Sequence, residues 1–285
     1  MLIDVTSALI RALSFVAMFQ AAGLALFLAL LAPPLQRSSR RVRNLGFGSA
    51  IAAIVLVALH YCLEAARMAG TFRGVFDPDL QQLVLDSRLS NAAAWRLLGL
   101  ALIAGSIRLK HGVATQIATL GAMCVLLGFT FVGHTAADDQ PVWLALVLVL
   151  HLMIAAFWFG SLAPLIIISV EEPAQRTVHL IAKFTRFASI VVPGLLLMGI
   201  VLTLALVPRW SVFGESYGLL LIAKTSGFAS LMVLASLNKW RHCPSLEHSP
   251  TAAASFRRTV AAEYVVICAV FAVTAVMTTF FSPQE

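Results

Sequence analysis

Long apolar runs separated by short polar segments recur along the whole chain of 285 residues. A helix of about 20 apolar residues is long enough to cross the hydrocarbon core of a bilayer. Eight runs approach this length, and they predict an all-α membrane protein with eight transmembrane helices. The third run is the weakest, because it is short and contains Arg96. The predicted spans cover residues 8–32, 45–68, 90–107, 114–134, 142–168, 187–207, 216–238 and 259–281.

The composition supports a bilayer as the solvent. Hydrophobic residues make up 60% of the chain and charged residues only 12%, whereas soluble domains carry about 25% charged residues. The mean hydropathy is +0.92. A deficit of this size indicates apolar surface that faces lipid. The N-terminal sequence MLID lacks the basic segment of a cleaved signal peptide, so we expect the first run to be retained as a helix.

The distribution of basic residues predicts the orientation. The net charge is +7, but nucleic-acid binding is not indicated, because the basic residues fall in alternate short loops. Basic residues mark cytoplasmic loops, so both termini are predicted to be extracytoplasmic. The residues that define these loops are Arg37, Arg40, Arg41, Arg43, Arg108, Lys110, Arg176, Lys183, Arg186, Lys239, Arg241, Arg257 and Arg258.

The chain also divides into two similar halves of four spans, residues 1–134 and 135–285, which together form one membrane domain. The first span contains AAGLALFLALLAP and the fifth contains AAFWFGSLAPL. Arg96 lies near the outer end of the third span, and Lys224 lies in a similar place in the seventh. Because four is an even number, both halves would have the same orientation, which predicts a parallel repeat.

Three of the seven histidines belong to one layer toward the extracytoplasmic side. His60 and His151 each lie roughly 12 Å inside the outer end of a span, and His134 ends the fourth span. Arg96 and Lys224 lie at a similar depth. Ionisable residues inside a bilayer are costly and usually face the bundle interior or a water-filled cavity. This layer is therefore the predicted functional region.

The second span places a candidate metal site on one helical face. His60, Glu64 and Met68 follow one another at intervals of four residues, and Glu64 can also pair with Arg67. Imidazole binds copper, zinc and iron, and methionine sulfur favours Cu(I). We expect His134 and His151 to complete the set of ligands. In the alternative interpretation, His60 and Glu64 only hydrogen-bond to each other and to neighbouring helices.

Other residues fit a path for copper or a different ligand. Met18, Met123 and Met198 lie near mid-membrane and could serve as soft ligands, although methionine is also an ordinary core residue. Arg96 and Lys224 suit an anionic group, such as haem propionates or a lipid phosphate, or they extend to interfacial water.

Glu263 lies on the last span near its cytoplasmic end. It either pairs with a basic residue or relays protons, and the sequence leaves both readings open. The candidate basic partners are Lys183, Arg186 and Arg258.

From Gly133 onward, the sequence contains GHTAADDQPVWLALVLVLHLMIAAFWFGSLAPL, FTRFAS, YGLLLIAKTSGFASLMVLASLNKWR and FRRTVAAEYVVICAVFAVTAVMTTFFSP. This second half resembles the CopD family of bacterial copper-resistance membrane proteins. The resemblance implies a protein of the bacterial inner membrane that moves copper, often together with a periplasmic carrier of the CopC type. It adds Trp158 and Glu263 to the copper path. The other positions that carry the resemblance are His134, His151, Gly160, Phe184, Ser189, Tyr217, Gly218, Lys224, Asn238 and Trp240.

Three functions follow from these observations. The first is copper movement from or to the periplasm through an outer histidine-lined site, without enzymatic activity. The second is a membrane protein that binds haem b, with His60 and His151 as axial ligands on facing helices and Arg96 and Lys224 at the propionates. CopD-like proteins have haem-binding relatives, which supports this alternative. The third is an assembly protein without ligand chemistry.

Several other classes are not indicated by the sequence. The chain contains no GxxxxGK[ST] loop, so no ATP-binding site of its own is predicted. The metalloprotease motif HExxH does not occur. The four cysteines form no CxxC pair, so neither a disulfide framework nor a zinc site is expected.

Overall fold

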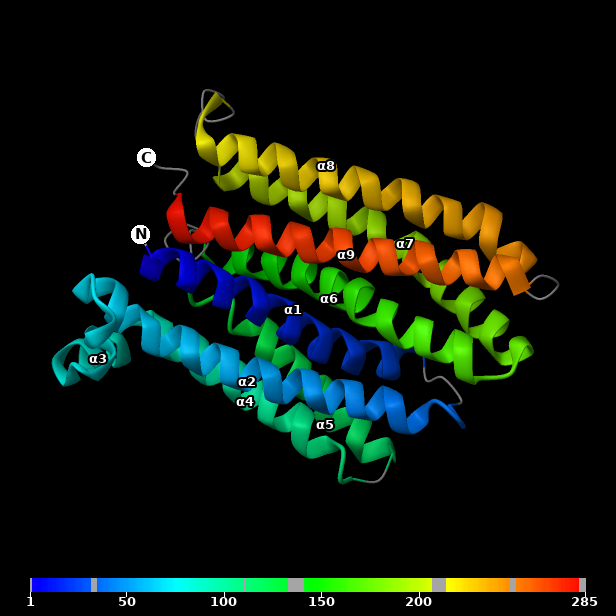
Figure 1. Cartoon of the computed structure of the whole chain (residues 1–285), viewed down its shortest axis with the longest axis horizontal. Helices are drawn as coiled ribbons and strands as arrows, with labels where there is room; N and C mark the ends of the chain where they lie inside the picture. Colours follow the sequence, from blue (N-terminus) through cyan, green and yellow to red (C-terminus); the bar gives the residue numbers. More distant parts are fainter. Residues whose placement is uncertain are drawn as a thin grey trace.

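The computed structural model describes residues 2–31, 35–109, 111–132, 141–206, 214–246 and 250–281. Within these ranges the chain is helical and contains no strand. The long helices lie side by side along one axis, and the beginning of α1 and the end of α9 lie at the same end of the bundle (Figure 1). The α-helices are α1 (Leu2–Leu31), α2 (Ser39–Ala69), α3 (Pro78–Leu85), α4 (Arg88–Ser106), α5 (His111–Leu127), α6 (Pro141–Glu171), α7 (Ala174–Leu206), α8 (Ser216–Leu237) and α9 (Pro250–Phe280).

Each of the eight predicted spans overlaps one of these helices, and α3 is the additional one. Six of them, α1, α2, α6, α7, α8 and α9, are long and apolar enough to cross a membrane. Helix α4 has 19 residues and α5 has 17, and neither belongs to this set. The structure therefore confirms an all-helical chain with six candidate membrane spans.

The helix boundaries differ from the predicted spans in two ways. Helices α2, α7 and α9 begin earlier than predicted, because hydropathy detects the lipid-facing part of a helix and misses the polar turns that precede it. The fourth predicted span, 114–134, was too long. Helix α5 ends at Leu127, and Gly128 begins a series of turns in which its N–H donates to the carbonyl of Cys124 at 3.0 Å.

A short helical cap joins α2 to α4. Helix α2 ends at Ala69 and is capped by Gly70, whose positive φ of 69° suits glycine. The 3-10 helix η1 (Phe72–Phe76) follows. Asp77 then begins α3: its Oδ1 accepts hydrogen bonds from the N–H groups of Asp79 at 3.0 Å and Leu80 at 3.2 Å. This cap projects from the same end of the bundle as the beginning of α1 (Figure 1).

Helix α1 is the centre of the bundle and packs against α2, α5, α6 and α9. Its middle part is almost entirely buried, and it approaches α6 closely at Gly23 and Gly160. A Cβ atom at Gly23 would overlap the carbonyl oxygen of Ala156, and one at Gly160 would overlap the backbone of Gly23. Membrane helices associate through such small residues, which let backbones pack without intervening side chains. The division into residues 1–134 and 135–285 stays a prediction.

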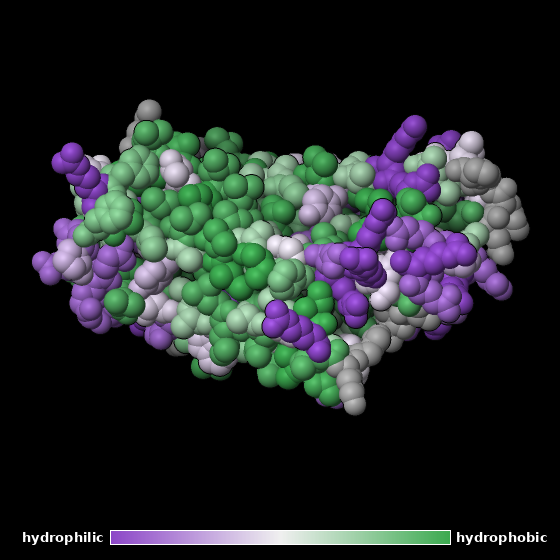
Figure 2. All heavy atoms as spheres, turned by 60° about the horizontal axis from the view of Figure 1, so that its bottom comes forward, coloured by the Kyte–Doolittle hydropathy of each residue, from purple (hydrophilic) through white to green (hydrophobic). Residues whose placement is uncertain are grey.

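The surface is apolar around its middle, and hydrophilic side chains gather mainly toward the two ends of the bundle (Figure 2). We call one end the basic end: it contains the starts of α2, α7 and α9, with Arg41, Arg176 and Arg257. The opposite end, with the start of α1 and the ends of α2 and α9, is called the terminal end (Figure 1).

Glu172 fastens the connection between α1 and α2 to the end of α6. Its Oε1 accepts hydrogen bonds from the N–H of Gln36 at 2.9 Å, the N–H of Ser38 at 2.9 Å and the hydroxyl of Ser38 at 2.7 Å. Arg41 forms an ion pair with the adjacent Glu171. These contacts hold the start of α2 against the end of α6 at the basic end.

Candidate functional site

His60 of α2 is held by an arginine that the sequence analysis did not single out. The imidazole is buried, with 7% of the residue exposed. Arg11 of α1 donates to its Nε2 from Nε at 3.3 Å and from Nη2 at 3.1 Å. A guanidinium has only donors, so Nε2 accepts and the neutral ring carries its hydrogen on Nδ1. This Nδ1 is buried and has no hydrogen-bond partner among the described residues.

Arg11 also reaches the last helix and the second ionisable residue of α2. Its Nη1 donates to the carbonyl oxygen of Thr278 at 2.7 Å and to Oγ1 of Thr278 at 3.2 Å. Its Nη2 lies 3.8 Å from Oε1 of Glu64. One nitrogen and several oxygens from α2 and α9 therefore surround this cationic group. We call Asp4, Arg11, His60, Glu64, Arg67 and Thr278 the His60 cluster.

The predicted pairing of Glu64 with Arg67 is confirmed. Arg67 Nη1 lies 3.0 Å from Oε2 of Glu64 and 3.2 Å from Oε1. The Nε2 of His60 lies 3.5 Å from Oε1 of Glu64, as expected for residues four apart on a helix. Arg67 further contacts Oδ1 of Asp4 at 3.5 Å and donates to the carbonyl of Thr279 at 3.4 Å. The cluster thus joins α1, α2 and α9 at the terminal end.

Arg96 of α4 lies close enough to this cluster for its charge to act on the His60 ring. It is 8% exposed, and its Cζ lies 4.1 Å from the centre of the Phe129 ring, in a cation–π contact. Its Nε is buried and has no hydrogen-bond partner in the described part of the chain. Arg11, Arg67 and Arg96 thus bring three positive charges to a region where Asp4 and Glu64 supply two negative ones.

The structure does not assemble all of the predicted metal ligands. Met68 is 53% exposed at the end of α2, whereas His60 and Glu64 turn toward the bundle. His134 lies outside the described residues. Among the residues that the structure describes, no group of three or more His, Cys, Asp or Glu side chains is placed to hold a metal ion. His60 and Glu64 remain together as candidate ligands.

His151 occupies a separate position on α6. Its Nδ1 lies 3.2 Å from the carbonyl oxygen of Leu195 on α7, so Nδ1 carries the hydrogen and the lone pair is on Nε2. The charge of Lys224 on α8 acts on this ring. The structure thus places Lys224 with His151 and Arg96 with His60. The contacts of the two histidines belong to different helices, with α1 lying between α2 and α6.

Glu263 belongs to a third buried group, the Glu263 cluster, formed by Trp158, Asn238 and Glu263. Glu263 is 3% exposed. Its Oε1 accepts a hydrogen bond from Nδ2 of Asn238 at 2.6 Å, and the side chain of Trp158 is a further donor to the carboxyl group. Asn238 begins the π-helical segment η4 (Asn238–His242), which follows α8.

The basic partners proposed for Glu263 are not found beside it. Lys183 donates instead to the carbonyl of Leu31, at the end of α1, at 2.7 Å. No ion pair of Glu263 with Arg186 or Arg258 occurs among the described residues. The sequence resemblance had selected Trp158, Asn238 and Glu263 separately, and the structure brings all three together.

The three candidate methionines lie on three helices. Met18 of α1 is 1% exposed and belongs to the hydrophobic core, which is the ordinary role of a buried methionine. Met123 of α5 and Met198 of α7 are half-buried. A path through them stays a prediction.

All four cysteines are free, as expected from their spacing.

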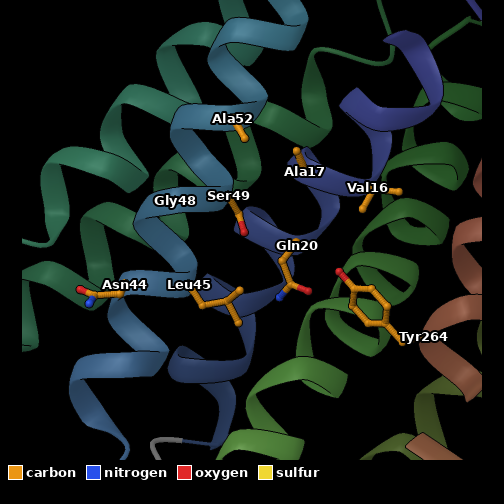
Figure 3. Close-up of a pocket in the computed structure, with 9 residues that line it drawn as sticks. All are labelled: Val16, Ala17, Gln20, Asn44, Leu45, Gly48, Ser49, Ala52 and Tyr264. Carbon is orange, nitrogen blue, oxygen red and sulfur yellow. The ribbon is translucent and has the colours of Figure 1, made fainter. Parts of the chain in front are cut away.

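A mainly apolar groove that the sequence analysis missed opens between α1, α2 and α9. Its volume is about 450 Å³, and Figure 3 shows the side chains of Gln20, Ser49 and Tyr264 directed toward the same space. Gln20 also donates to the carbonyl of Gly160 at 3.1 Å, at the close approach of α1 and α6. The groove is lined by Val16, Ala17, Gln20, Asn44, Leu45, Gly48, Ser49, Ala52 and Tyr264.

Comparison with known proteins identifies the family. Residues 1–142 match the family model described as copper resistance protein D-like, N-terminal domain, and residues 178–277 match the one described as copper resistance protein D. The chain belongs to the copper resistance protein D family. The resemblance seen from Gly133 onward is thus confirmed, and membership of the family extends to the first half.

Two curated relatives are similar to this chain. Copper resistance protein D of Pseudomonas syringae pv. tomato is 26% identical over 223 residues, which cover 73% of this chain and 71% of the relative. Copper transport protein CutJ of Bacillus subtilis (strain 168) is 27% identical over 166 residues, covering 56% of this chain but only 30% of that protein. No solved structure matches the chain.

Proposed function

We propose that this protein moves copper across the bacterial inner membrane. It acts as a transporter without enzymatic activity and crosses the bilayer eight times, with the terminal end on the periplasmic side and the basic end in the cytoplasm. Membership of the copper resistance protein D family supports copper handling, and the position of basic residues supports the orientation. Transport is driven by a gradient, the membrane potential or a partner.

The observation that carries this proposal is the set of atoms around the Arg11 guanidinium. His60 Nε2, Glu64 Oε1 and the Thr278 carbonyl oxygen all face this one positive group, at 3.1, 3.8 and 2.7 Å. Imidazole nitrogen and oxygen atoms are also copper ligands. In this proposal, Arg11 is a tethered cation that occupies the ligand atoms until copper displaces it.

His151 provides the next position on the copper path. Because its Nδ1 faces the carbonyl of Leu195, its Nε2 lone pair is the one that would bind a metal. His134 lies at the periplasmic mouth in this proposal, where a carrier of the CopC type would deliver copper. The path then continues past the methionines toward Trp158 and Glu263.

Copper accumulation in cells tests this function. We expect His60→Ala and His151→Ala each to abolish copper-dependent accumulation, while the protein stays inserted in the membrane. His179→Ala is the matched control, because His179 is exposed near the start of α7 at the basic end. Wild-type accumulation in both the His60 and the His151 variant would refute copper movement through these residues.

Haem binding is the second candidate function. The observation in its favour is that each histidine has a basic neighbour, Arg96 for His60 and Lys224 for His151, and such groups suit propionates. Axial ligation would require His60 and His151 to face one iron, whereas His60 contacts Arg11 of α1 and His151 contacts Leu195 of α7. A visible spectrum of the purified protein, oxidised and then reduced with dithionite, separates the two functions. A strong Soret band would favour haem, and a featureless spectrum would favour copper.

A further inference from the structure

The Glu263 carboxyl group lies deep in the bundle, near the midpoint of α9, and only neutral groups hold it. Its two donors are the amide of Asn238, at 2.6 Å, and the side chain of Trp158. In the described part of the chain, no lysine, arginine or histidine forms an ion pair with it. An ionised carboxylate at membrane depth is expensive unless a cation compensates it. The protonated acid avoids this cost.

One ionisable residue of the elements packed around Glu263 is known to interact with it electrostatically. It is Cys243 of the 3-10 helix η5 (Cys243–Ser245). Lys239 turns away and donates to Oγ of Ser189 at 3.0 Å. The ionisable residues of these elements are Asp4 and Arg11 of α1, His151 and Glu171 of α6, Tyr217 and Lys224 of α8, Lys239, Arg241 and His242 of η4, Cys243 of η5, and Arg257, Arg258, Tyr264 and Cys268 of α9 itself.

Asn238 supplies the second, independent observation. Its Nδ2 donates to Glu263, but its Oδ1 is buried and has no hydrogen-bond partner among the described residues. An ionised carboxylate can only accept hydrogen bonds, so it cannot satisfy this oxygen. A protonated carboxylic acid can, because its O–H would donate to Oδ1 while Nδ2 continues to donate to Oε1. Acid and amide would then form a ring of two hydrogen bonds.

We propose that Glu263 is a proton-binding site and that Asn238 is the residue that pairs with its acid form. On loading, a proton from water at the basic end forms an O–H bond with the free carboxylate oxygen, and this O–H donates to Oδ1 of Asn238. On release, the O–H bond breaks, the proton returns to water and Oδ1 loses its donor. The π-helical segment η4 presents Asn238 to α9, and π-helical turns frequently occur at functional sites. This proton site goes beyond the copper proposal and does not depend on it.

Infrared spectroscopy of the full-length, copper-free protein in lipid nanodiscs tests the site. We expect a carbonyl stretch of a protonated carboxylic acid that grows as the pH is lowered and is absent from Glu263→Gln. Glu64→Gln is the matched control: Glu64 also lies within a membrane helix, but Arg67 pairs with it at 3.0 Å, so the band is expected to persist in this variant. Wild-type protein without such a band, or the same band in Glu263→Gln, would overturn the proposal.

Asn238→Leu tests the pairing itself. Without Oδ1 the O–H loses its acceptor, so the carbonyl stretch is expected to move to a higher frequency. An unchanged frequency would overturn the role of Asn238.

If Glu263→Gln does not fold, as judged by size-exclusion chromatography, Glu263→Asp replaces it. The shorter acid cannot keep the 2.6 Å contact, so its band must shift, and an unshifted band would overturn the assignment. None of these measurements involves copper, so they stand apart from the transport experiment.

Discussion

Arg11 of α1 and His60 of α2 lie on adjacent helices, and two nitrogens of the arginine donate to one nitrogen of the histidine. Nε and Nη2 of Arg11 contact Nε2 of His60 at 3.3 and 3.1 Å. The imidazole nitrogen that could bind a metal is therefore already in use. Copper and the guanidinium compete for the same lone pair, so the arginine sets how readily the histidine accepts a metal ion.

Replacing Arg11 by Gln is expected to tighten copper binding. The substitution removes a competing cation next to His60 and Glu64, and a hydrogen bond to a charged group contributes about 1.5–3 kcal/mol. A gain of about tenfold in affinity corresponds to about 1.4 kcal/mol. Competition with a Cu(I) chelator measures this change. The gain is expected to disappear in Arg11→Gln/His60→Ala, and weaker binding by Arg11→Gln alone would contradict the competition.

Removing the carboxylate of Glu64 is expected to destabilise the fold more than removing His60. Glu64→Ala leaves Arg67 and Arg11 without their shared partner. Breaking a buried ion pair costs up to about 3–5 kcal/mol. The cost expected here is smaller, because these side chains are partly exposed. Thermal unfolding in detergent measures the loss. The double variant Glu64→Ala/Arg67→Ala should recover part of it, because the unpaired charge is removed. A Glu64→Ala protein as stable as the wild type would mean that the pair contributes nothing.

The helices of this bundle could be located from hydropathy because the apolar runs are long, and the Glu64–Arg67 pair followed from a spacing of three residues within one helix. Contacts between helices could not be found in that way. Arg11 is an example: it lies inside the first predicted span, so its depth in the membrane was a signal, but only the packing of α1 on α2 shows that it reaches His60.

Glu263, near the midpoint of α9, illustrates the same limit. Its charge suggested a basic partner, yet its neighbour is the amide of Asn238, which a local π-helical segment brings toward α9. Hydrophobic periodicity contains no information about such a departure from the regular α-helix. The resemblance to the CopD family did select Trp158, Asn238 and Glu263, but it could not show that they form one cluster.

Gly160→Ala is expected to destabilise the bundle, because the added methyl group would overlap the backbone of Gly23 where α1 crosses α6. Overpacking of this kind costs about 1–3 kcal/mol. Gly48→Ala on α2 is the matched control, since a Cβ there meets nothing within 4 Å and alanine is the better helix former. Thermal unfolding in detergent distinguishes the two. Equal stability of both variants would show that α1 and α6 are not in backbone contact.

Glu172 is expected to make stability depend on pH. Burial raises the pKa of this carboxyl group, but hydrogen bonds from Ser38, Gln36 and Arg37 lower it more, so that the pKa falls below the ordinary value of 4.5. A lowered folded-state pKa stabilises the fold above the unfolded value, and this contribution is lost as the pH falls through the folded value. Glu172→Gln should therefore unfold at a lower temperature than the wild type at pH 7, and the difference should shrink below pH 4.5. A difference that stays constant into acid would contradict this role.

Copper uptake into proteoliposomes that contain the purified, full-length protein and a trapped Cu(I)-sensitive dye tests the central proposal most directly. Wild-type protein and His179→Ala are expected to take up copper at the same rate, and His60→Ala is expected to lose most of the uptake although it is equally well inserted. Uptake by His60→Ala at the wild-type rate, or no uptake by the wild-type protein in either orientation, would contradict copper transport through the His60 cluster.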